Sequence, residues 1–369
     1  MRYRVSCQAG FERYCAREMA LLGGSPLGSG QGFVFLEGHP RLVYVLNRYA
    51  RTAERVLVEM AAARLDEDDV VDSLISRCDF GLLGRVTGVT LDADESVTRL
   101  RSRWMTHLSS LLPRAFGSRG GVRVQRGRSD AYLYLGVDGS SASLYADTTG
   151  DSLNFREYRV YNHPSSIRPS LAASLVFMAN ADGGVLYDPF CGGGTILIEA
   201  ALMSLARPTH ARRTYRFRSF AEYTAEEERS ASLNHPVIRP FEYEVGTEIN
   251  SVHLKGCRKN LSAAGLGDLR VSLGDCTKTV LERRADVIVT NPPYGVRGSK
   301  LTRMEALSSR FLQNLPNILR PGGRAVVVTS DAEMLKREMA RTGLVPSEVA
   351  KTLHSHLWVE GIAFRMPEG

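Results

Sequence analysis

The sequence is poor in lysine and cysteine, and it contains no long apolar run. Its six Cys residues are scattered, at positions 7, 15, 78, 191, 257 and 276, and no two have Cys-x-x-Cys spacing. This scatter argues against a zinc cage and a disulfide framework, and it fits a reducing cytoplasm. No apolar run approaches the roughly 20 residues that a membrane-spanning helix needs. The first residues pass directly into an amphipathic pattern without a signal peptide. We therefore expect a cytoplasmic protein that spans no membrane and binds no metal.

The charge balance permits a polyanionic partner without proving one. The formal net charge is +7 at pH 7 and the pI is about 9.1. Most of the basic residues are Arg, because Lys occurs only at positions 255, 259, 278, 300, 336 and 351. Arg favours planar, bidentate phosphate contacts, although genome composition can produce the same bias. A length of 369 residues exceeds one typical core and predicts two or three domains.

The first 150 residues predict two successive α+β units. In the first, a strand at 3–9, a helix at 11–22, a strand at 32–36 and a helix from 42 suggest a small sandwich. The second is expected to contain strands at 56–60, 86–91, 131–137 and 142–145, with helices at 66–78 and 97–116. Arg123, Arg126 and Arg128 lie in a basic loop of this unit. They could contact phosphates or form a solvated surface, because this half also carries many Asp and Glu. Residues 147–165 read as a connector.

From about residue 160, strands and helices alternate strictly. Strands are predicted at 185–187, 241–246, 269–273, 287–290 and 325–329, and helices at 196–205, 252–264, 304–319 and 332–342. The last two strands, at 347–353 and 358–365, are adjacent in sequence and are expected to form an antiparallel hairpin. This alternation predicts a doubly wound α/β fold with a mostly parallel sheet.

Acidic residues stand at three successive strand ends. Asp188 opens the stretch Asp188-Pro-Phe-Cys-Gly-Gly-Gly-Thr195, which is unlike a dinucleotide fingerprint and suits a cationic amine better than a pyrophosphate. Glu248 is placed to accept hydrogen bonds from two ribose hydroxyls. Asp275 could accept from an adenine amino group, and the Cys276 N–H could serve a ring nitrogen. Each acid alone could be a helix cap or a turn former, but together they indicate S-adenosylmethionine.

The stretch Asn291-Pro-Pro-Tyr-Gly295 follows the strand at 287–290. By itself it could be only a tight turn. The side-chain oxygen of Asn291 and the carbonyl of Pro292 could each accept one hydrogen of an exocyclic NH2, while Tyr294 stacks on the ring. Such an amine is a poor nucleophile, so methyl transfer would depend on positioning and electrostatics. A nucleic-acid base would have to leave its stack to reach this site.

Together these motifs resemble the amino methyltransferases of the Rossmann-like class. The final hairpin fits them too, and residues 163–172 look like their cofactor-covering segment. The resemblance implies catalytic roles for Asn291, Pro292 and Tyr294. It implies a cofactor set of His163, Arg168, Asp188, Cys191, Gly192, Gly194, Thr195, Glu248, Ile249, Asp275, Cys276 and Asn291.

The first half of the chain resembles a ferredoxin-like domain followed by a THUMP domain. Residues 152–159 look like the tail that closes it. The resulting domains are a ferredoxin-like domain at 1–52, a THUMP RNA-binding domain at 53–148, a linker at 149–165 and a Rossmann-like methyltransferase domain at 166–369. The expected methyltransferase sheet has seven strands, mostly parallel, with a terminal antiparallel hairpin.

The resemblance also implies the reaction. Members of the family with a THUMP unit methylate N2 of guanosine in tRNA or rRNA. Asn before Pro-Pro-Tyr looks more like members that modify tRNA in the acceptor stem, at position 6, than those that act at position 10. The ribosomal RNA enzymes share the Asn form, so that substrate stays open. Methylation of DNA adenine or protein glutamine uses the same amide grip but needs no THUMP-like unit. An RNA-binding protein that has lost catalysis is the remaining alternative.

A basic run at residues 207–218 contains Arg212, Arg213 and Arg216. Beside an RNA-type domain, such a run could hold phosphates near the target, although many charge runs are solvated faces. Arg297 and Lys300 could also clamp the substrate. No spacing among the His residues indicates a metal site or a nucleophile and base pair. We expect a monomer.

Overall fold

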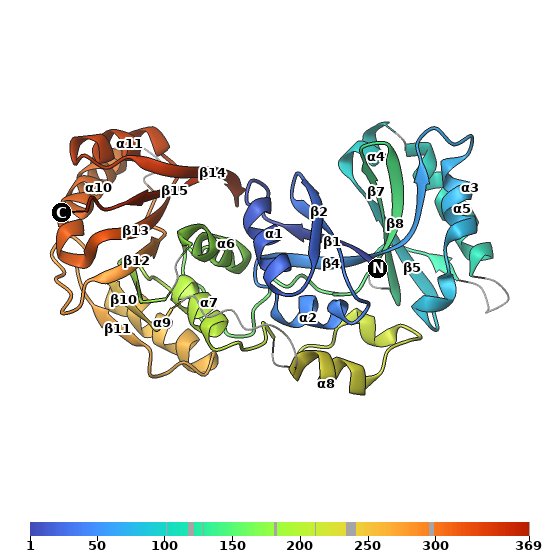
Figure 1. Cartoon of the computed structure of the whole chain (residues 1–369), viewed down its shortest axis with the longest axis horizontal. Helices are drawn as coiled ribbons and strands as arrows, with labels where there is room; N and C mark the ends of the chain where they lie inside the picture. Colours follow the sequence, from blue (N-terminus) through green and yellow to red (C-terminus); the bar gives the residue numbers. More distant parts are fainter. Residues whose placement is uncertain are drawn as a thin grey trace.

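The computed structural model describes residues 1–100, 102–116, 122–127, 129–180, 183–210, 212–233, 241–294 and 299–368. Two β-sheets lie one beyond the other along the long axis of the molecule (Figure 1). One sheet has eight strands from the first 147 residues, and the other has seven strands from the second half. Among the described residues, no helix is both long enough and apolar enough to cross a bilayer.

The eight-stranded sheet has the order β2-β3-β1-β4-β8-β7-β5-β6. Its strands are β1 (Arg2–Cys7), β2 (Ser25–Gly30), β3 (Phe33–Glu37), β4 (Ala53–Arg64), β5 (Gly88–Ala93), β6 (Arg123–Val124), β7 (Ala131–Asp138) and β8 (Ser141–Asp147). Its helices are α1 (Glu12–Leu21), α2 (Leu42–Tyr49), α3 (Val70–Arg77), α4 (Glu95–Leu100) and α5 (Ser102–Ala115), with a 3-10 turn at Phe80–Leu83. The expected helix at 97–116 thus corresponds to α4 and α5.

Strand β4 joins the two predicted N-terminal units into one sheet. It pairs with β1 through residues 53–58 and with β8 through residues 57–64. The guanidinium of Arg4, on β1, adds a second link, because it lies 2.6 Å from the carboxylate of Asp94 in the second unit and 3.9 Å from the ring centre of Phe33. Pairing with a carboxylate offsets part of the desolvation cost of burying this guanidinium. The two units therefore form one continuous body.

The seven-stranded sheet has the order β11-β10-β9-β12-β13-β15-β14. Its strands are β9 (Val185–Asp188), β10 (Tyr243–Glu248), β11 (Arg270–Leu273), β12 (Ala285–Thr290), β13 (Leu319–Thr329), β14 (Pro346–His354) and β15 (Leu357–Arg365). All neighbours are parallel except the pairs that involve β15. This arrangement confirms the predicted Rossmann-like sheet with its terminal antiparallel hairpin.

Helices cover both faces of the second sheet (Figure 1). They are α6 (Pro169–Ala179), α7 (Thr195–Ser204), α9 (Ser251–Ala263), α10 (Ser299–Ile318) and α11 (Ala332–Arg341). Helix α8 (Ala225–Leu233) lies below α2 in the same view, and a 3-10 turn spans Arg216–Ser219. The sequence Pro321-Gly322-Gly323 follows the end of α10 and lies inside β13, whose register against β12 shifts there.

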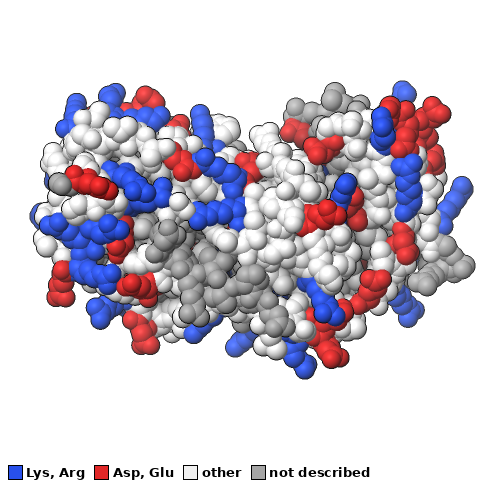
Figure 2. All heavy atoms as spheres, viewed as in Figure 1, with Lys and Arg blue, Asp and Glu red and all other residues white. Residues whose placement is uncertain are grey.

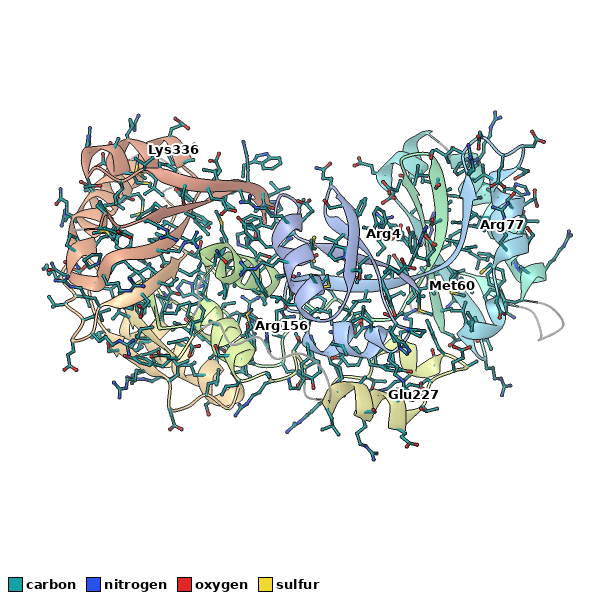
Figure 3. The ribbon with its side chains drawn as sticks, viewed as in Figure 1. Arg4, Met60, Arg77, Arg156, Glu227 and Lys336 are labelled. Atoms are coloured by element: carbon teal, nitrogen blue, oxygen red, sulfur yellow. The ribbon has the colours of Figure 1, made fainter. Side chains whose placement is uncertain are left out.

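The seven-stranded sheet is linked to the N-terminal body by a buried ion network. The carboxylate of Glu199, on α7, lies 2.9 Å from the Arg156 guanidinium and 3.3 Å from that of Arg51. The hydroxyl of Tyr158 donates to the same carboxylate at 2.7 Å. Burial raises the pKa of Glu199 less than the two guanidinium groups lower it, so its pKa stays below the usual range. Figure 3 marks Arg156 at this junction. The predicted linker is therefore packed through Arg156 and Tyr158.

Candidate active site

A cavity of about 400 Å³ opens at the carboxyl ends of β9, β10, β11 and β12. The strand order reverses between β9 and β12, and ligands of open α/β sheets bind at such a reversal. The cavity is lined by His163, Asp188, Cys191, Gly192, Thr195, Glu248, Ile249, Asp275, Cys276 and Asn291, among others.

The predicted catalytic and cofactor sets together hold fourteen different residues, and these ten line the cavity. The other four, Arg168, Gly194, Pro292 and Tyr294, do not.

The glycine loop after β9 is closely packed. Gly192 and Gly194 have positive φ values of 52° and 80°, a region that favours glycine. A Cβ on Gly194 would lie 2.7 Å from the sulfur of Cys257, so Gly194 supports the loop from behind. Asn260, on α9, donates to the carbonyl of Gly193 at 2.8 Å and to that of Tyr161 at 3.0 Å. No sequence motif singled out Asn260, because its role depends on segments 67 and 99 residues away.

Asp188 is a buried carboxylate without a cationic partner among the described residues. Its Oδ1 accepts a hydrogen bond from the Thr290 hydroxyl at 2.7 Å and from the Phe190 N–H at 3.2 Å. Burial raises the pKa of Asp188 to about 7, although the Thr290 hydroxyl opposes this shift. A buried carboxylate that is only partly ionised near neutral pH favours a cationic ligand, because the cation restores the charged form.

Glu248 and Asp275 are already hydrogen-bonded within the chain. The carboxylate of Glu248 accepts from the Gly192 N–H at 3.1 Å and from the Asn250 N–H at 2.8 Å. Asp275 accepts from the N–H and the hydroxyl of Thr277 at 2.9 and 2.7 Å, and these bonds lower the pKa of Asp275. Both carboxylates are therefore held in place at the cavity and keep further lone pairs for a ligand.

The covering segment reaches the cavity through His163 and Ser165. The His163 ring meets the His253 ring edge to face at 4.2 Å between centres, and burial lowers the pKa of His163. Arg168 is exposed and its Nη1 lies 3.5 Å from the side-chain oxygen of Gln8, so it points to the N-terminal body. A cofactor role for Arg168 stays a prediction.

Asn291 connects the covering segment with the Pro-Pro-Tyr turn. Its Nδ2 donates to the Ser165 carbonyl at 3.3 Å, and its Oδ1 accepts from the Tyr294 hydroxyl. Pro292 and Tyr294 line a second, neighbouring cavity, and Pro293 lines both. Burial raises the pKa of Tyr294, so its hydroxyl is a neutral donor.

The predicted RNA-binding residues do not gather at one place. Arg123, Arg126 and Arg212 are exposed. Arg213 donates to the Ser152 carbonyl at 3.0 Å, and Arg216 lies 3.6 Å from the buried carboxylate of Asp147, so both also serve contacts within the chain. Arg128, Arg297 and the side chain of Lys300 lie outside the described residues. Figure 2 shows Lys and Arg side chains gathered on the left of the view, over the unit that contains the seven-stranded sheet.

One acidic group outside this site has metal-like spacing. Possible ligand atoms of Asp69, Asp72 and His107 lie within 4.8 Å of one another. Asp69, however, accepts from the N–H groups of Val71 and Asp72 and so caps α3. The cap accounts for the position of Asp69.

Residues 156–359, more than half of the chain, match the family described as RMKL-like, methyltransferase domain. The chain belongs to this family. Residues 3–57 of this RMKL-like protein match the RlmL ferredoxin-like domain. The match at the N-terminus extends into β4, the strand that the two N-terminal units share.

Relatives of this RMKL-like protein carry two kinds of name. A Methanocaldococcus jannaschii protein named tRNA (guanine(6)-N2)-methyltransferase is 26% identical, and the alignment covers 94% of this chain and 95% of that protein. An Archaeoglobus fulgidus protein of the same name is also 26% identical, and the alignment covers 93% of this chain and 87% of that protein. The Syntrophotalea carbinolica ribosomal RNA large subunit methyltransferase K/L is 25% identical over 91% of this chain, but the match covers only 50% of that protein.

Solved structures share the fold of this RMKL-like protein over its whole length. A possible methylase from Clostridium difficile 630 has a TM-score of 0.78 at 21% identity, with 100% of this chain and 98% of that chain covered. A putative methyltransferase complexed with SAH, SMU.472, has a TM-score of 0.77 at 17% identity, with 100% and 98% covered.

Proposed function

We propose that this protein transfers a methyl group from S-adenosylmethionine to N2 of a guanosine in tRNA. The observation that carries the proposal is the shared cavity of Asp188, Glu248, Asp275 and Asn291, each at the end of a different parallel strand. Three carboxylates suit a ligand with an amine, a ribose and an adenine, and an amide beside them suits an amine acceptor. The relatives named as guanine-N2 methyltransferases support the same reaction.

The donor set fits S-adenosylmethionine. Asp188 is a buried carboxylate with two neutral hydrogen-bond donors, which favours a cationic group nearby. A Cβ on Gly193 would lie 3.3 Å from His163, so the glycines leave room that a larger residue would fill. Glu248 would hold the ribose hydroxyls, and Asp275 with the Cys276 N–H would hold the adenine. The cofactor supplies an electrophilic methyl group.

The chain's own residues then handle the acceptor amine. The Asn291 side-chain oxygen and the Pro292 carbonyl accept its two hydrogens, and Tyr294 packs on the base. Because Nδ2 of Asn291 is held by Ser165, its oxygen is the atom that remains for the amine. Holding both hydrogens favours a pyramidal nitrogen with an available lone pair. After transfer, the cationic nitrogen loses a proton to Asn291 or water.

The partner and target follow from the N-terminal half and the relatives. We propose that residues 53–148 form a THUMP domain that docks on RNA, with exposed Arg123 and Arg126 near phosphates. Exposed Arg212, in the basic run at residues 207–218, would hold a phosphate near the target. The relatives favour tRNA position 6. A ribosomal RNA target is the second candidate, because a K/L-type relative is 25% identical over 91% of this chain. We further propose a cytoplasmic monomer.

The test is to incubate the protein with labelled S-adenosylmethionine and unmodified tRNA or ribosomal RNA, then identify the nucleosides by mass spectrometry. Labelled N2-methylguanosine from tRNA supports the proposal, and label in ribosomal RNA alone favours the second candidate. Labelled adenosine, or no transfer to any RNA, contradicts guanine-N2 methylation. A calorimetric titration with S-adenosylmethionine separates an enzyme from a catalytically inactive RNA-binding protein, which would not bind it.

A further inference from the structure

A second cavity, of about 250 Å³, adjoins the Pro-Pro-Tyr turn. Pro293 lines both this cavity and the first one, whereas Pro292 and Tyr294 line only the second. The remaining walls come from α10, the end of β13 and the start of α11. The cavity therefore lies where a ring would extend when its amine is held by Asn291 and Pro292.

The walls combine an aromatic face, aliphatic side chains and two carboxylates. Tyr294 is the aromatic residue, and Met334 and Leu335 are among the aliphatic ones. Such surfaces accept a planar ring, since aromatic stacking and apolar contact do not depend on hydrogen bonds. Asp331 and Glu305 supply negative charge and Arg337 supplies positive charge, so charged and polar groups on the wall select which ring edges can approach.

Asp331 is the better placed of the two carboxylates. Its Oδ1 accepts from the Met334 N–H at 3.0 Å, which caps α11, and its own N–H donates to the Thr329 hydroxyl at 3.0 Å. Within the described part of the chain, no hydrogen bond to its Oδ2 is present. Glu305, by contrast, has a cationic partner, because the Arg337 guanidinium lies 3.9 Å away.

We propose, on the basis of the function above, that Asp331 selects guanine by accepting a hydrogen bond from its N1–H. Guanine carries this donor next to the N2 amine. A ring with the same amine but a lone pair at N1 would be repelled by the carboxylate. Asn291 and Pro292 would recognise an amine on any ring, whereas Asp331 would select rings that carry a hydrogen-bond donor next to that amine.

The test uses Asp331→Asn and two RNA substrates. Asn caps a helix about as well as Asp, so α11 keeps its cap. One tRNA carries guanosine at the target position, and the other carries 2-aminopurine, which keeps the N2 amine but has an acceptor at N1. The wild-type protein should prefer guanosine by kcat/KM. In Asp331→Asn, guanosine methylation should fall about 10- to 100-fold, because a hydrogen bond to a charged group is lost. The kcat/KM for the 2-aminopurine substrate should fall little, because the Asn amide can donate a hydrogen bond to N1.

Glu333→Gln is the matched control. It removes the same charge from the same helix, at a side chain that is 83% exposed and outside the cavity, and it should preserve the substrate preference. The proposal is overturned if Asp331→Asn keeps the wild-type preference, even with both rates lowered, or if Glu305→Gln abolishes the preference instead. Unchanged S-adenosylmethionine affinity in Asp331→Asn shows that the fold is intact. If the wild-type protein methylates no guanosine, the proposed function fails first and this inference fails with it.

Discussion

The hydroxyl of Tyr294 donates a hydrogen bond to the side-chain oxygen of Asn291. The proposed mechanism assigns this same oxygen to the amine of the target base. We propose that the amine replaces the Tyr294 hydroxyl on this oxygen, and that the ring of Tyr294 is then available for stacking. Since Ser165 holds the other end of the amide, the Asn291 side chain can stay in place during this exchange.

Removing the Tyr294 hydroxyl should have a smaller effect than removing its ring. We expect Tyr294→Phe to keep most of its activity, because the ring remains and the Asn291 oxygen is released. Tyr294→Ala should lose about 5- to 150-fold in kcat/KM, the range of one base–aromatic stack. Steady-state kinetics on the RNA substrate measures both. Equal losses in the two variants would show that the hydroxyl, rather than the ring, is needed.

Replacing Asn291 should separate transfer from cofactor binding. Asn291→Ala removes one acceptor of the amine, and loss of one such positioned group lowers kcat by about 100- to 1,000-fold in other enzymes. The affinity for S-adenosylmethionine, measured by calorimetry, should change little, since Asp188, Glu248 and Asp275 remain. Turnover of Asn291→Ala near the wild-type rate would contradict the proposed hydrogen bond from the target amine to Asn291.

Cofactor affinity should fall as the pH is lowered through about 7. Burial raises the pKa of Asp188 to about 7 in the free protein, so below that pH a proton must leave before a cation can pair with the carboxylate. Affinity should decline about tenfold per pH unit below the pKa. Dissociation constants measured from pH 5 to 8 test this. Methylthioadenosine, which lacks the amine, should show no such dependence, and neither should Asp188→Asn with S-adenosylmethionine.

The buried ion network should contribute to stability. Glu199→Gln leaves the guanidinium groups of Arg51 and Arg156 buried without their counter-ion, and removal of one partner from a buried pair costs about 3–5 kcal/mol. Urea denaturation followed by circular dichroism gives the free energy of unfolding. Glu242→Gln, in an exposed pair with Arg283, is the control and should behave like the wild-type protein. If Glu199→Gln changed the free energy of unfolding as little as Glu242→Gln does, the buried ion network would not contribute to stability.

An exposed arginine of the second unit should contribute to RNA affinity through charge alone. Arg126→Ala should weaken tRNA binding and lower the slope of log affinity against log salt by about 1, the effect of one phosphate contact. Filter binding at several salt concentrations measures it. Arg64→Ala, at a residue paired with Asp66 at 2.7 Å, is the control. If the slope of log affinity against log salt stayed unchanged in Arg126→Ala, Arg126 would not contact a phosphate of the RNA.

Local patterns were sufficient for most of the catalytic sheet. Alternating apolar runs and turns predicted its strands and final hairpin, because central strands such as β9 and β12 are buried on both faces and read as short apolar runs. Strand β2 was missed, since Ser25-Pro-Leu-Gly-Ser-Gly30 is mostly exposed and has no apolar alternation. Helix α6 was also missed as a helix. It is buried all round, and so it lacks the amphipathic period that marks a surface helix.

The sequence by itself determined which residues stand at the strand ends, because Asp188 and Glu248 close their strands, Asn291 directly follows β12 and Asp275 comes two residues after β11. The tertiary structure decided which groups face one another across long separations. Asn260 holds the glycine loop, Glu199 holds two arginines from other segments, and Asp331 borders the cavity beside Tyr294. Such contacts depend on how helices and strands pack against one another, and this packing cannot be predicted from the spacing of residues along the chain.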